Sequence, residues 1–311
     1  MSQNYDLIVV GGGPAGLSGA ITAAKRGLRV VVFESGAYGG LLAALYPEKI
    51  IPNYPGFSGT ARELVNSLLE EARSLGVELK KERVIEITEQ RIVKTLEEQF
   101  QGKAILIATG ARPKELGVPG EAEFNYGERG VYYYVSNPEQ FKGKKVLVVG
   151  GGNTAIDAAL DLANIASEVN LIHRRDKFRA LESSLEKLRQ KGNVKIFLNT
   201  ELEEIRGIER VEKAVLYNSE KQIDFEVEVQ AVVIAVGLIP NNEMFQKLGL
   251  KLDYEGRIKV DEKQKTNLSG IYAAGDIVAG SGKLELIILA VAQGMIAAHN
   301  AYLDIMQPYW K

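Results

Sequence analysis

The chain contains the same glycine-rich turn twice, and this repeat constrains its fold more than any other feature. The first copy reads Gly11-Gly12-Gly13-Pro14-Ala15-Gly16, and the second reads Gly150-Gly151-Gly152-Asn153-Thr154-Ala155. Each copy follows a short apolar run, a pattern that predicts a strand, a tight turn and a helix. Two copies in equivalent settings predict two domains, each with a mainly parallel sheet and each suited to a dinucleotide. The alternative interpretation is that both copies are only tight turns in an α/β fold.

The residue at the end of the second strand differs between the two copies. Glu34 ends the apolar run after the first turn, and His173 stands at the same spacing after the second turn, before Arg174 and Arg175. A carboxylate at this point accepts hydrogen bonds from ribose hydroxyls and repels a 2′-phosphate. Guanidinium groups bind phosphate through charge-assisted, often bidentate bonds. The arginines, with Arg179 one turn later, therefore indicate NADPH at the second site.

The geometry of the turn explains why glycine is needed and where the phosphates go. The first glycine permits the tight turn, the second lets the backbone approach the pyrophosphate, and the third, or Ala155, lets the helix pack closely. The pyrophosphate is then expected at the helix N-terminus, where free N–H groups and the helix dipole favour an anion.

Two further apolar runs, residues 104–110 and 231–237, end in glycine, and each is soon followed by a proline. We interpret each run as the strand that closes the unit opened by its glycine turn. A last strand-like segment, residues 270–276, has no glycine turn of its own, and the simplest topology lets it complete the first unit.

The predicted fold is α/β, with two doubly wound, Rossmann-like dinucleotide-binding domains, the second inserted in the first. The inserted domain is expected at residues 115–240. The outer domain is expected to combine residues 1–114 with residues 241–311.

Composition excludes several other kinds of site. The chain has no cysteine, which excludes disulfides, cysteine-ligated iron–sulfur clusters, thiolate nucleophiles and a redox dithiol. Its two histidines, His173 and His299, are far apart in sequence, so no metal site is expected. A net charge of −2 gives no sign of nucleic-acid binding. No signal peptide and no membrane-spanning segment are expected, so a cytoplasmic location is the default.

Several blocks resemble the two-dinucleotide flavoprotein reductases of the thioredoxin reductase type. Besides the two glycine turns, they are Gly39-Gly40, Ala108-Thr109-Gly110, residues 173–180 and Gly275-Asp276. The resemblance implies FAD on the first domain, NADPH on the second and a homodimer. Thioredoxin reductases have a Cys-x-x-Cys shortly before the second turn, whereas Tyr134 and Asn137 stand at those positions here.

Other blocks resemble the ferredoxin–NADP⁺ reductases built on the thioredoxin reductase scaffold. They are residues 44–49 (Ala-Leu-Tyr-Pro-Glu-Lys), Gly56-Phe57 and Gly282-Lys283-Leu284. In that group the tyrosine of the first block stacks on the flavin ring, which implies this catalytic role for Tyr46; core packing is the alternative. An aromatic residue of a C-terminal extension covers the other flavin face in that group. Here Tyr309 and Trp310 are the candidates, and a frayed terminus is the alternative.

The resemblance implies hydride transfer from NADPH to the flavin, then one-electron steps to ferredoxin or flavodoxin, with no acid or base residue. A helix that starts near Lys283 and Leu284 is expected to direct its N-terminus at the flavin and to stabilise its reduced, anionic form. A plain buried helix is the alternative. Two other functions stay open: a general NAD(P)H diaphorase or dehydrogenase acting on quinones, flavins or oxygen, and a non-enzymatic redox sensor.

The predicted contacts follow from the turns and from the resemblance. For FAD they are Gly11, Gly13, Pro14, Ala15, Gly16, Glu34, Gly40, Leu41, Leu42, Tyr46, Asn53, Val84, Thr109, Gly110, Asp276, Lys283 and Leu284. For NADPH they are Gly150, Gly152, Asn153, Thr154, Ala155, His173, Arg174, Arg175, Arg179, Val236 and Gly237. A loop turn is the alternative for Asn53, and packing is the alternative to a nicotinamide-lining role for the aromatic run Tyr132-Tyr133-Tyr134.

Overall fold

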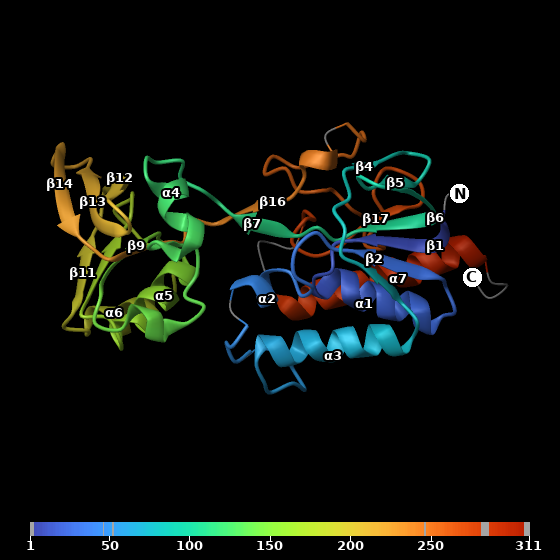
Figure 1. The fold of residues 1–311 in the computed structure, drawn as a ribbon, viewed down its shortest axis with the longest axis horizontal. Coiled ribbons are helices and arrows are strands. Elements are labelled where there is room, and N and C mark those ends of the chain that lie inside the picture. The colour runs from blue at the N-terminus through green and yellow to red at the C-terminus, as the bar shows by residue number, and fades with distance from the viewer. Residues whose placement is uncertain (1–2, 46, 52, 246, 281–285, 308–311) are drawn as a thin grey trace. The chain divides into compact units, whose positions relative to one another are not determined.

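The computed structural model describes residues 3–45, 47–51, 53–245, 247–280 and 286–307. The predicted contacts Tyr46, Lys283 and Leu284 lie outside these ranges, as do Tyr309 and Trp310. The chain divides into two compact units: unit 1 combines Met1–Arg112 with Ile239–Lys311, and unit 2 is Pro113–Leu238 (Figure 1). These limits lie within two residues of the boundaries expected from the sequence. Which nucleotide each unit binds stays a prediction.

Unit 1 is built around a mainly parallel sheet with strand order β3-β2-β1-β6-β5-β4, in which β17 pairs with the second half of β6. Only the β4–β5 hairpin runs antiparallel to its neighbours in this sheet. The strands are β1 (Gln3–Val10), β2 (Val30–Phe33), β3 (Glu78–Lys80), β4 (Glu86–Ile87), β5 (Ile92–Lys94), β6 (Gln99–Ile107) and β17 (Ile271–Ala273). The helices are α1 (Pro14–Lys25), α2 (Leu41–Leu45), α3 (Ala61–Ser74) and α7 (Ile287–Met306), with a short 3₁₀ helix at Glu243–Phe245.

Alternate residues of β1 point to opposite faces of this sheet, as the two-residue period of a strand requires. Leu7 and Val9 are fully buried in a cluster with residues of α1 and α7, whereas Ile8 and Val10 pack with Val84 on the other face. The continuous apolar run of β1 is therefore explained by a strand that is buried on both faces. Figure 1 shows the three long helices of unit 1 lying together, and α1 contacts both α3 and α7.

Helices α1 and α7 cross at a point where both backbones come unusually close. A Cβ on Gly294 would lie 2.0 Å from the carbonyl oxygen of Ala15, so no other residue fits there. The Ser18 hydroxyl donates to the Val291 carbonyl at 3.0 Å across the same crossing. The buried side chain of Gln293 accepts the N–H of Gly275 at 2.9 Å. The crossing therefore places the turn after β17 beside the first turn of α1.

Unit 2 has a five-stranded parallel sheet in the order β11-β10-β9-β15-β8 and a separate antiparallel sheet in the order β12-β13-β14. Its strands are β8 (Val131–Tyr132), β9 (Lys145–Val149), β10 (Glu168–Ile172), β11 (Val194–Phe197), β12 (Thr200–Gly207), β13 (Val211–Asn218), β14 (Ile223–Glu228) and β15 (Ala231–Ile234). Its helices are α4 (Glu121–Asn125), α5 (Asn153–Ala163) and α6 (Glu182–Arg189), with 3₁₀ helices at Tyr126–Glu128 and Pro138–Phe141. Val146 and Val148 pack with α5 and α6, whereas Leu147 and Val149 pack with the antiparallel sheet, a layer that the sequence patterns did not predict.

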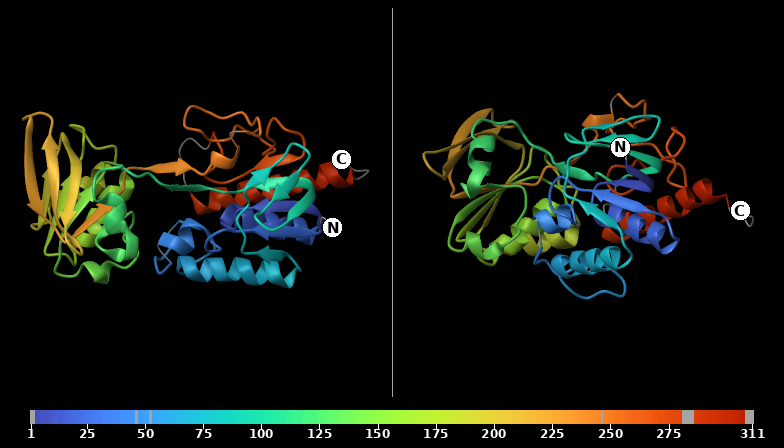
Figure 2. Two further views of the ribbon diagram at one scale, coloured as in Figure 1. Left: turned by 45° about the horizontal axis from the view of Figure 1, so that its top comes forward. Right: turned by 45° about the vertical axis from the view of Figure 1, so that its right-hand side comes forward.

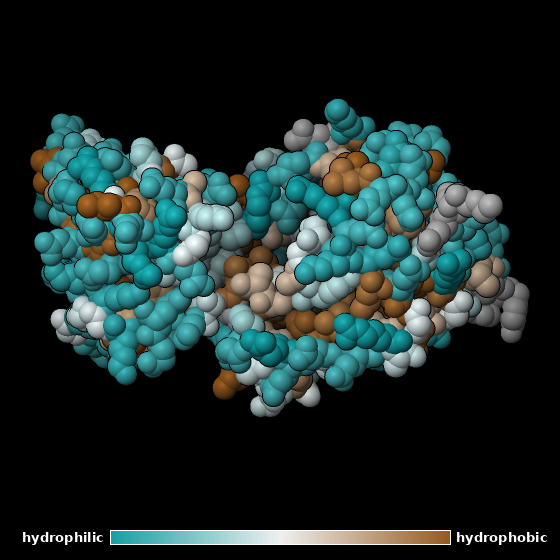
Figure 3. Space-filling view, in the orientation of Figure 1, coloured by the Kyte–Doolittle hydropathy of each residue, from teal (hydrophilic) through white to brown (hydrophobic). Residues whose placement is uncertain are grey.

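The chain passes between the units twice, at β7 (Ala111–Pro113) and β16 (Leu238–Pro240), and these two strands pair with each other (Figure 2). The predicted fold class is confirmed, since both units are α/β with parallel sheets and the second is inserted in the first. Polar side chains cover most of the face drawn in Figure 3. Within the described ranges, no helix combines the length and the apolar character that crossing a bilayer requires.

Candidate functional site

The first glycine turn lies at the carboxyl edge of the parallel sheet in unit 1. Gly11 donates its N–H to the Phe33 carbonyl at 2.8 Å, and its φ of +109° favours glycine. A Cβ on Gly11 would lie 2.2 Å from the carbonyl oxygen of Ala108 and 3.0 Å from the nitrogen of Thr109. The structure therefore brings the Ala-Thr-Gly segment after β6 directly against the turn.

Gly39 and Gly40 also lie against this turn. The Gly39 N–H donates to the Gly12 carbonyl at 2.7 Å, and a Cβ on Gly40 would lie 3.4 Å from the Cα of Gly13. Gly13 and Gly40 thus face each other with backbone atoms alone, and a side chain on either residue would fill the space between them. The absence of side chains lets a pyrophosphate approach backbone N–H groups closely, so these residues fit the phosphate part of a dinucleotide.

Helix α1 begins with donor groups that no side chain satisfies. Its N-cap is Gly13, Pro14 occupies the first helical position, and Ala15 and Gly16 follow. No side chain caps this end, and the first turn contains no acidic residue. The free N–H groups and the helix dipole favour an anion at this end.

Glu34 stands at the end of β2, as the sequence predicted, and is tied to the glycine turn. Its carboxylate accepts the N–H of Gly12 at 2.8 Å and the N–H of Gly36 at 2.7 Å. Each carboxylate oxygen has two lone pairs, so both retain an acceptor site for a ribose hydroxyl. The geometry of Glu34 fits the predicted role.

Tyr38 is a residue of this site that the sequence did not reveal. Its ring covers Gly12, since a Cβ on Gly12 would lie 2.6 Å from a ring carbon of Tyr38. Its hydroxyl oxygen is buried and finds no hydrogen-bond partner in the described part of the chain. Burial, together with the charge of Glu34, raises the pKa of Tyr38 to about 12. No periodic pattern marks this residue, because its contact depends on how the loop folds back.

The structure places the remaining predicted FAD contacts less directly. Leu42 and Val84 are buried in apolar clusters. Asn53 is exposed, and Leu41 and Asp276 are half-buried. Helix α7 begins at Ile287, three residues later than the Lys283-Leu284 segment from which the sequence pattern predicted its start.

The second glycine turn repeats this arrangement in unit 2. Gly150 donates its N–H to the Ile172 carbonyl at 3.1 Å, and a Cβ on it would lie 2.3 Å from the carbonyl oxygen of Ala235. Val236 and Gly237 follow Ala235, so the structure brings this strand end to the turn. The N-cap of α5 is Gly152, with no side-chain cap and no acid in the first turn. Asn153 and Thr154 are exposed at this helix end, which also suits an anion.

The imidazole of His173 faces inward rather than toward solvent. It is 7% exposed and stacks on the Phe178 ring, with centroids 5.3 Å apart. Its Nε2 lies 3.1 Å from the Lys177 carbonyl, a bond that makes Nε2 the protonated nitrogen. Burial and the nearby arginine charges lower the pKa of His173, so the ring is neutral at pH 7.

Arg174, Arg175 and Arg179 are exposed on the segment 173–181, which we call the arginine loop. Within the described ranges, none of their guanidinium groups has an ion-pair or hydrogen-bond partner. The backbone N–H of Arg179 donates to the Gly151 carbonyl at 2.8 Å, so the loop lies against the glycine turn. Three cationic groups are thus left free beside a phosphate-binding turn, as binding of a further phosphate requires.

Asn137, one of the two positions that the resemblance matches to the thioredoxin reductase dithiol, caps a short helix here. The Asn137 side chain accepts the N–H of Glu139 at 3.2 Å and begins a 3₁₀ helix. Tyr132 packs edge-on against Phe141 with centroids 5.0 Å apart, and Tyr133 donates to the buried carboxylate of Glu121 at 3.0 Å. These contacts favour the packing interpretation for the first two tyrosines of the aromatic run.

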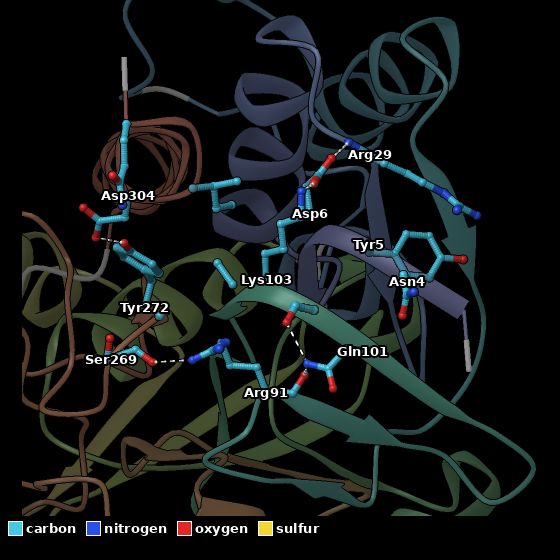
Figure 4. Close-up of a pocket in the computed structure, with 15 residues that line it drawn as sticks. Asn4, Tyr5, Asp6, Arg29, Arg91, Gln101, Lys103, Ser269, Tyr272 and Asp304 are labelled. Atoms are coloured by element: carbon cyan, nitrogen blue, oxygen red, sulfur yellow. Dashed lines mark hydrogen bonds and ion pairs between the residues drawn. The ribbon is translucent and has the colours of Figure 1, made fainter. Parts of the chain in front are cut away.

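One pocket, with a volume of about 860 Å³, lies at the opposite edge of the unit 1 sheet, where β1 and β6 begin (Figure 4). Its acids are already paired: Asp6 with Lys103 at 2.8 Å, and Asp304 with Tyr272 at 2.6 Å. None of the described residues that are predicted to bind a nucleotide lines it. In the described residues, no group of three or more potential metal ligands comes together.

The fold and the site together define a protein with two dinucleotide-binding units. An acid follows strand β2 in the first unit, and arginines follow strand β10 in the second. The chain belongs to the pyridine nucleotide-disulphide oxidoreductase family, whose model matches residues 5–294.

Two related proteins and one solved structure are similar to this chain over nearly its whole length. A ferredoxin–NADP reductase of Thermus thermophilus is 38% identical, covering 96% of this chain and 92% of that protein. One of Sulfurisphaera tokodaii is 40% identical, with 94% and 90% covered. A thioredoxin reductase of Lactococcus lactis, solved in the FR conformation, matches with a TM-score of 0.88 at 32% identity, covering 98% of this chain and 100% of that one.

Proposed function

We propose that this protein is an FAD-dependent oxidoreductase that transfers electrons between NADPH and a one-electron carrier, ferredoxin or flavodoxin. The observation that supports this most is the contrast between the two strand ends. Glu34 is hydrogen-bonded to the first glycine turn, whereas three arginines that have no partners among the described residues lie beside the second. The names of the relatives, which are ferredoxin–NADP reductases, point to the same activity.

Unit 1 is the proposed FAD site. The N-terminus of α1 and the bare backbone of Gly13 and Gly40 would hold the pyrophosphate, and Glu34 would accept hydrogen bonds from the adenosine ribose. The turn at Gly275-Asp276 lies beside Ala15, since a Cβ on Gly275 would be 3.0 Å from that of Ala15. Asp276 would then stand near the phosphate end of the proposed site.

Unit 2 is the proposed NADPH site. The N-terminus of α5 would hold the pyrophosphate of the coenzyme, and the arginine loop would bind the 2′-phosphate that NADH lacks. An acid at this strand end would repel that phosphate, which is why the arginine loop suits NADPH and Glu34 does not.

The chain itself offers no thiol to accept electrons, so the acceptor has to be an external molecule. FAD, when bound, takes two electrons from NADPH and releases them singly, and this redox chemistry belongs to the cofactor. One NADPH would thus reduce two one-electron carriers and yield NADP⁺ and one proton. The residues of the chain bind and orient the nucleotides, and no proton-transferring side chain is required.

We further expect a homodimer, which the resemblance to this group of reductases implies, and a cytoplasmic location as the default. Size-exclusion chromatography with light scattering tests the assembly, and a mass of one chain would contradict it.

The function is tested anaerobically with the purified, FAD-loaded protein. The flavin is reduced with NADPH and mixed with oxidised ferredoxin, and its reoxidation is followed at low and at high salt. Fast, ferredoxin-dependent reoxidation that slows with salt is the expected result, because charged surfaces steer such partners together. Full reduction by NADPH without transfer to ferredoxin or flavodoxin would instead support a diaphorase. Absence of reduction by NADPH would support a non-enzymatic sensor.

A further inference from the structure

The arginine loop has an exposed side and a buried side, and different residues form them. Arg174 and Arg175 are exposed, whereas the ring of His173 is 7% exposed and Phe178 is half-buried. The buried side consists of the His173–Phe178 stack, with ring planes 17° apart. The residues that shape the loop are therefore not the residues that it presents to a ligand.

The stack rests directly on the second glycine turn. A Cβ on Gly151 would lie 2.2 Å from a carbon of the His173 ring, so glycine is required at this position. The backbone N–H and carbonyl of His173 are also bonded, to Phe197 and Thr200 respectively, both at 2.9 Å. The imidazole is thus fixed between the glycine turn on one side and Phe178 on the other.

Three hydrogen bonds close the loop around this stack. The imidazole of His173 donates to the Lys177 carbonyl at 3.1 Å, and the N–H of Arg179 donates to the Gly151 carbonyl at 2.8 Å. The N–H of Leu181 donates to the side chain of Asn153, the first residue of α5, at 3.0 Å. The loop is tied to the turn at both ends, and the stacked rings fill the space between.

Within the described part of the chain the three guanidinium groups have no partners to hold them, so their position depends on the loop backbone. Binding a phosphate through planar, bidentate guanidinium groups is sensitive to their placement, and a shift of about 1 Å can cost on the order of a hundredfold. The backbone position of Arg174, Arg175 and Arg179 in turn depends on the rings beneath them.

We propose that the His173–Phe178 pair is a positioning element that sets the preference for NADPH over NADH without contact with the coenzyme. This rests on the proposed function, in which the arginine loop binds the 2′-phosphate. Loosening the stack removes the increase in affinity that the 2′-phosphate provides. NADH has no such phosphate, so its affinity does not fall in this way. Phe178 is therefore a specificity-determining residue that acts through its neighbours.

The first test is Phe178→Ala in the FAD-loaded protein, with ferricyanide as the acceptor. The kcat/KM for NADPH should fall roughly ten- to hundredfold and that for NADH by no more than about twofold. Phe178→Tyr keeps the ring and should keep the preference. The matched control is Phe225→Leu, which removes one ring of the Phe197–Phe225 pair, also in unit 2, with centroids 5.7 Å apart. This variant should change the kcat/KM for NADPH and that for NADH by the same factor.

The second test needs no substitution in the loop, so it holds even if Phe178→Ala does not fold. The chain has only two histidines, and His299→Gln assigns their NMR resonances. Arg174, Arg175 and Arg179 help to lower the pKa of His173, and Lys177 contacts it through its carbonyl. Adenosine 2′,5′-bisphosphate should offset these charges and raise the pKa of His173, whereas AMP should not. The His299 resonance serves as the reference.

The outcomes separate this proposal from the function on which it rests. A wild-type protein without preference for NADPH would overturn the NADPH assignment and the positioning role together. A wild-type preference that survives in Phe178→Ala would overturn the positioning role alone. An equal loss for both coenzymes would show that the stack supports only the fold. A pKa of His173 that adenosine 2′,5′-bisphosphate leaves unchanged would contradict 2′-phosphate binding by the arginine loop, and the positioning role would fall with it.

Discussion

The carboxylate of Glu34 accepts a hydrogen bond from the N–H of Gly12 at 2.8 Å, which joins the end of β2 to the turn between β1 and α1. The bond fixes where the acid stands before any ligand arrives, so the group that we propose to bind the ribose is preorganised. Preorganisation increases affinity because less ordering remains to be done on binding.

Glu34→Ala is therefore expected to weaken FAD binding. Hydrogen bonds to a charged group contribute about 1.5–3 kcal/mol each, so the Kd of the apoprotein for FAD should rise roughly ten- to hundredfold. Flavin fluorescence during titration of the apoprotein measures this. Glu89→Ala, at an exposed position of the same unit, is the control and should leave the Kd unchanged. Equal affinities of the Glu34 variant and the wild type would refute the role.

Arg174→Ala combined with Arg175→Ala should raise the KM for NADPH far more than that for NADH. In the proposed function the two lost contacts are to the 2′-phosphate, and a roughly hundredfold rise is expected from two charge-assisted bonds. Steady-state kinetics with both coenzymes give the comparison. Arg189→Ala removes an arginine that already pairs with Glu182 at 2.8 Å and should leave both KM values unchanged. A similar rise for both coenzymes would assign the arginines to a part that NADPH and NADH share.

Tyr38→Phe should leave the apoprotein as stable as the wild type or stabilise it by about 1 kcal/mol. Its hydroxyl is buried without a partner in the described ranges, and an unsatisfied buried group costs about 1–3 kcal/mol. The control is Tyr5→Phe, which removes a hydroxyl that donates to Glu78 at 2.5 Å and should destabilise the protein. Urea unfolding of the three proteins decides the matter. A larger loss for Tyr38→Phe than for Tyr5→Phe would mean that the Tyr38 hydroxyl has a stabilising partner after all.

Gly294→Ala should disrupt the crossing of α1 and α7. The added Cβ would lie 2.0 Å from the Ala15 carbonyl, and relieving such overpacking costs about 3 kcal/mol. Because the crossing also holds the turn at Gly275, FAD affinity should fall with stability. Thermal unfolding and FAD titration measure the two effects. Gly192→Ala, where a Cβ meets nothing within 4 Å, is the control and should be nearly neutral. A neutral Gly294→Ala would mean that the helices can separate without cost.

Because of Tyr272, the stability of the folded protein should depend on pH in the alkaline range. Burial, with the hydrogen bond to Asp304 and its charge, raises the pKa of Tyr272 far above the ordinary value. A raised pKa in the folded state stabilises the protein fully below the unfolded value of about 10, and this stabilisation is lost as the pH rises above it. Tyr272→Phe should thus be less stable than the wild type at pH 8, and the difference should shrink above pH 10. Urea unfolding across this pH range measures the difference in stability. A difference that stays constant would show that the pKa of Tyr272 is the same in the folded and the unfolded state.

Features that depend on neighbours in sequence were predictable from the sequence. The turn at Gly11 and the turn at Gly150 each join a strand to a helix as expected, because the apolar run and the glycines act within a few residues of each other. The insertion of unit 2 was also predictable, since each glycine turn needs a closing strand with parallel partners.

Features that depend on how distant segments pack were not predictable. The antiparallel sheet of unit 2 was missed because its strands are half-exposed and their pairing is set by contacts across the fold. The contact of His173 with the coenzyme stays a prediction, but the stacking of its ring on Phe178 was not foreseen, because no spacing rule reveals which way a side chain turns. Tyr38 went unnoticed for the same reason, as its contact with Gly12 is made by a loop.

β6 and β17 lie side by side in one sheet, although all of unit 2 separates them along the chain. Unit 2 is a continuous segment, so its strands leave the ribosome before β17 is synthesised. Domains generally fold as units during synthesis, and the sheet of unit 1 has to wait for its last strand and for the turn at Gly275. Biosynthesis therefore completes the two units in the reverse of the order in which they begin in the sequence, and the arginine loop is formed before the sheet beside Glu34 receives its last strand.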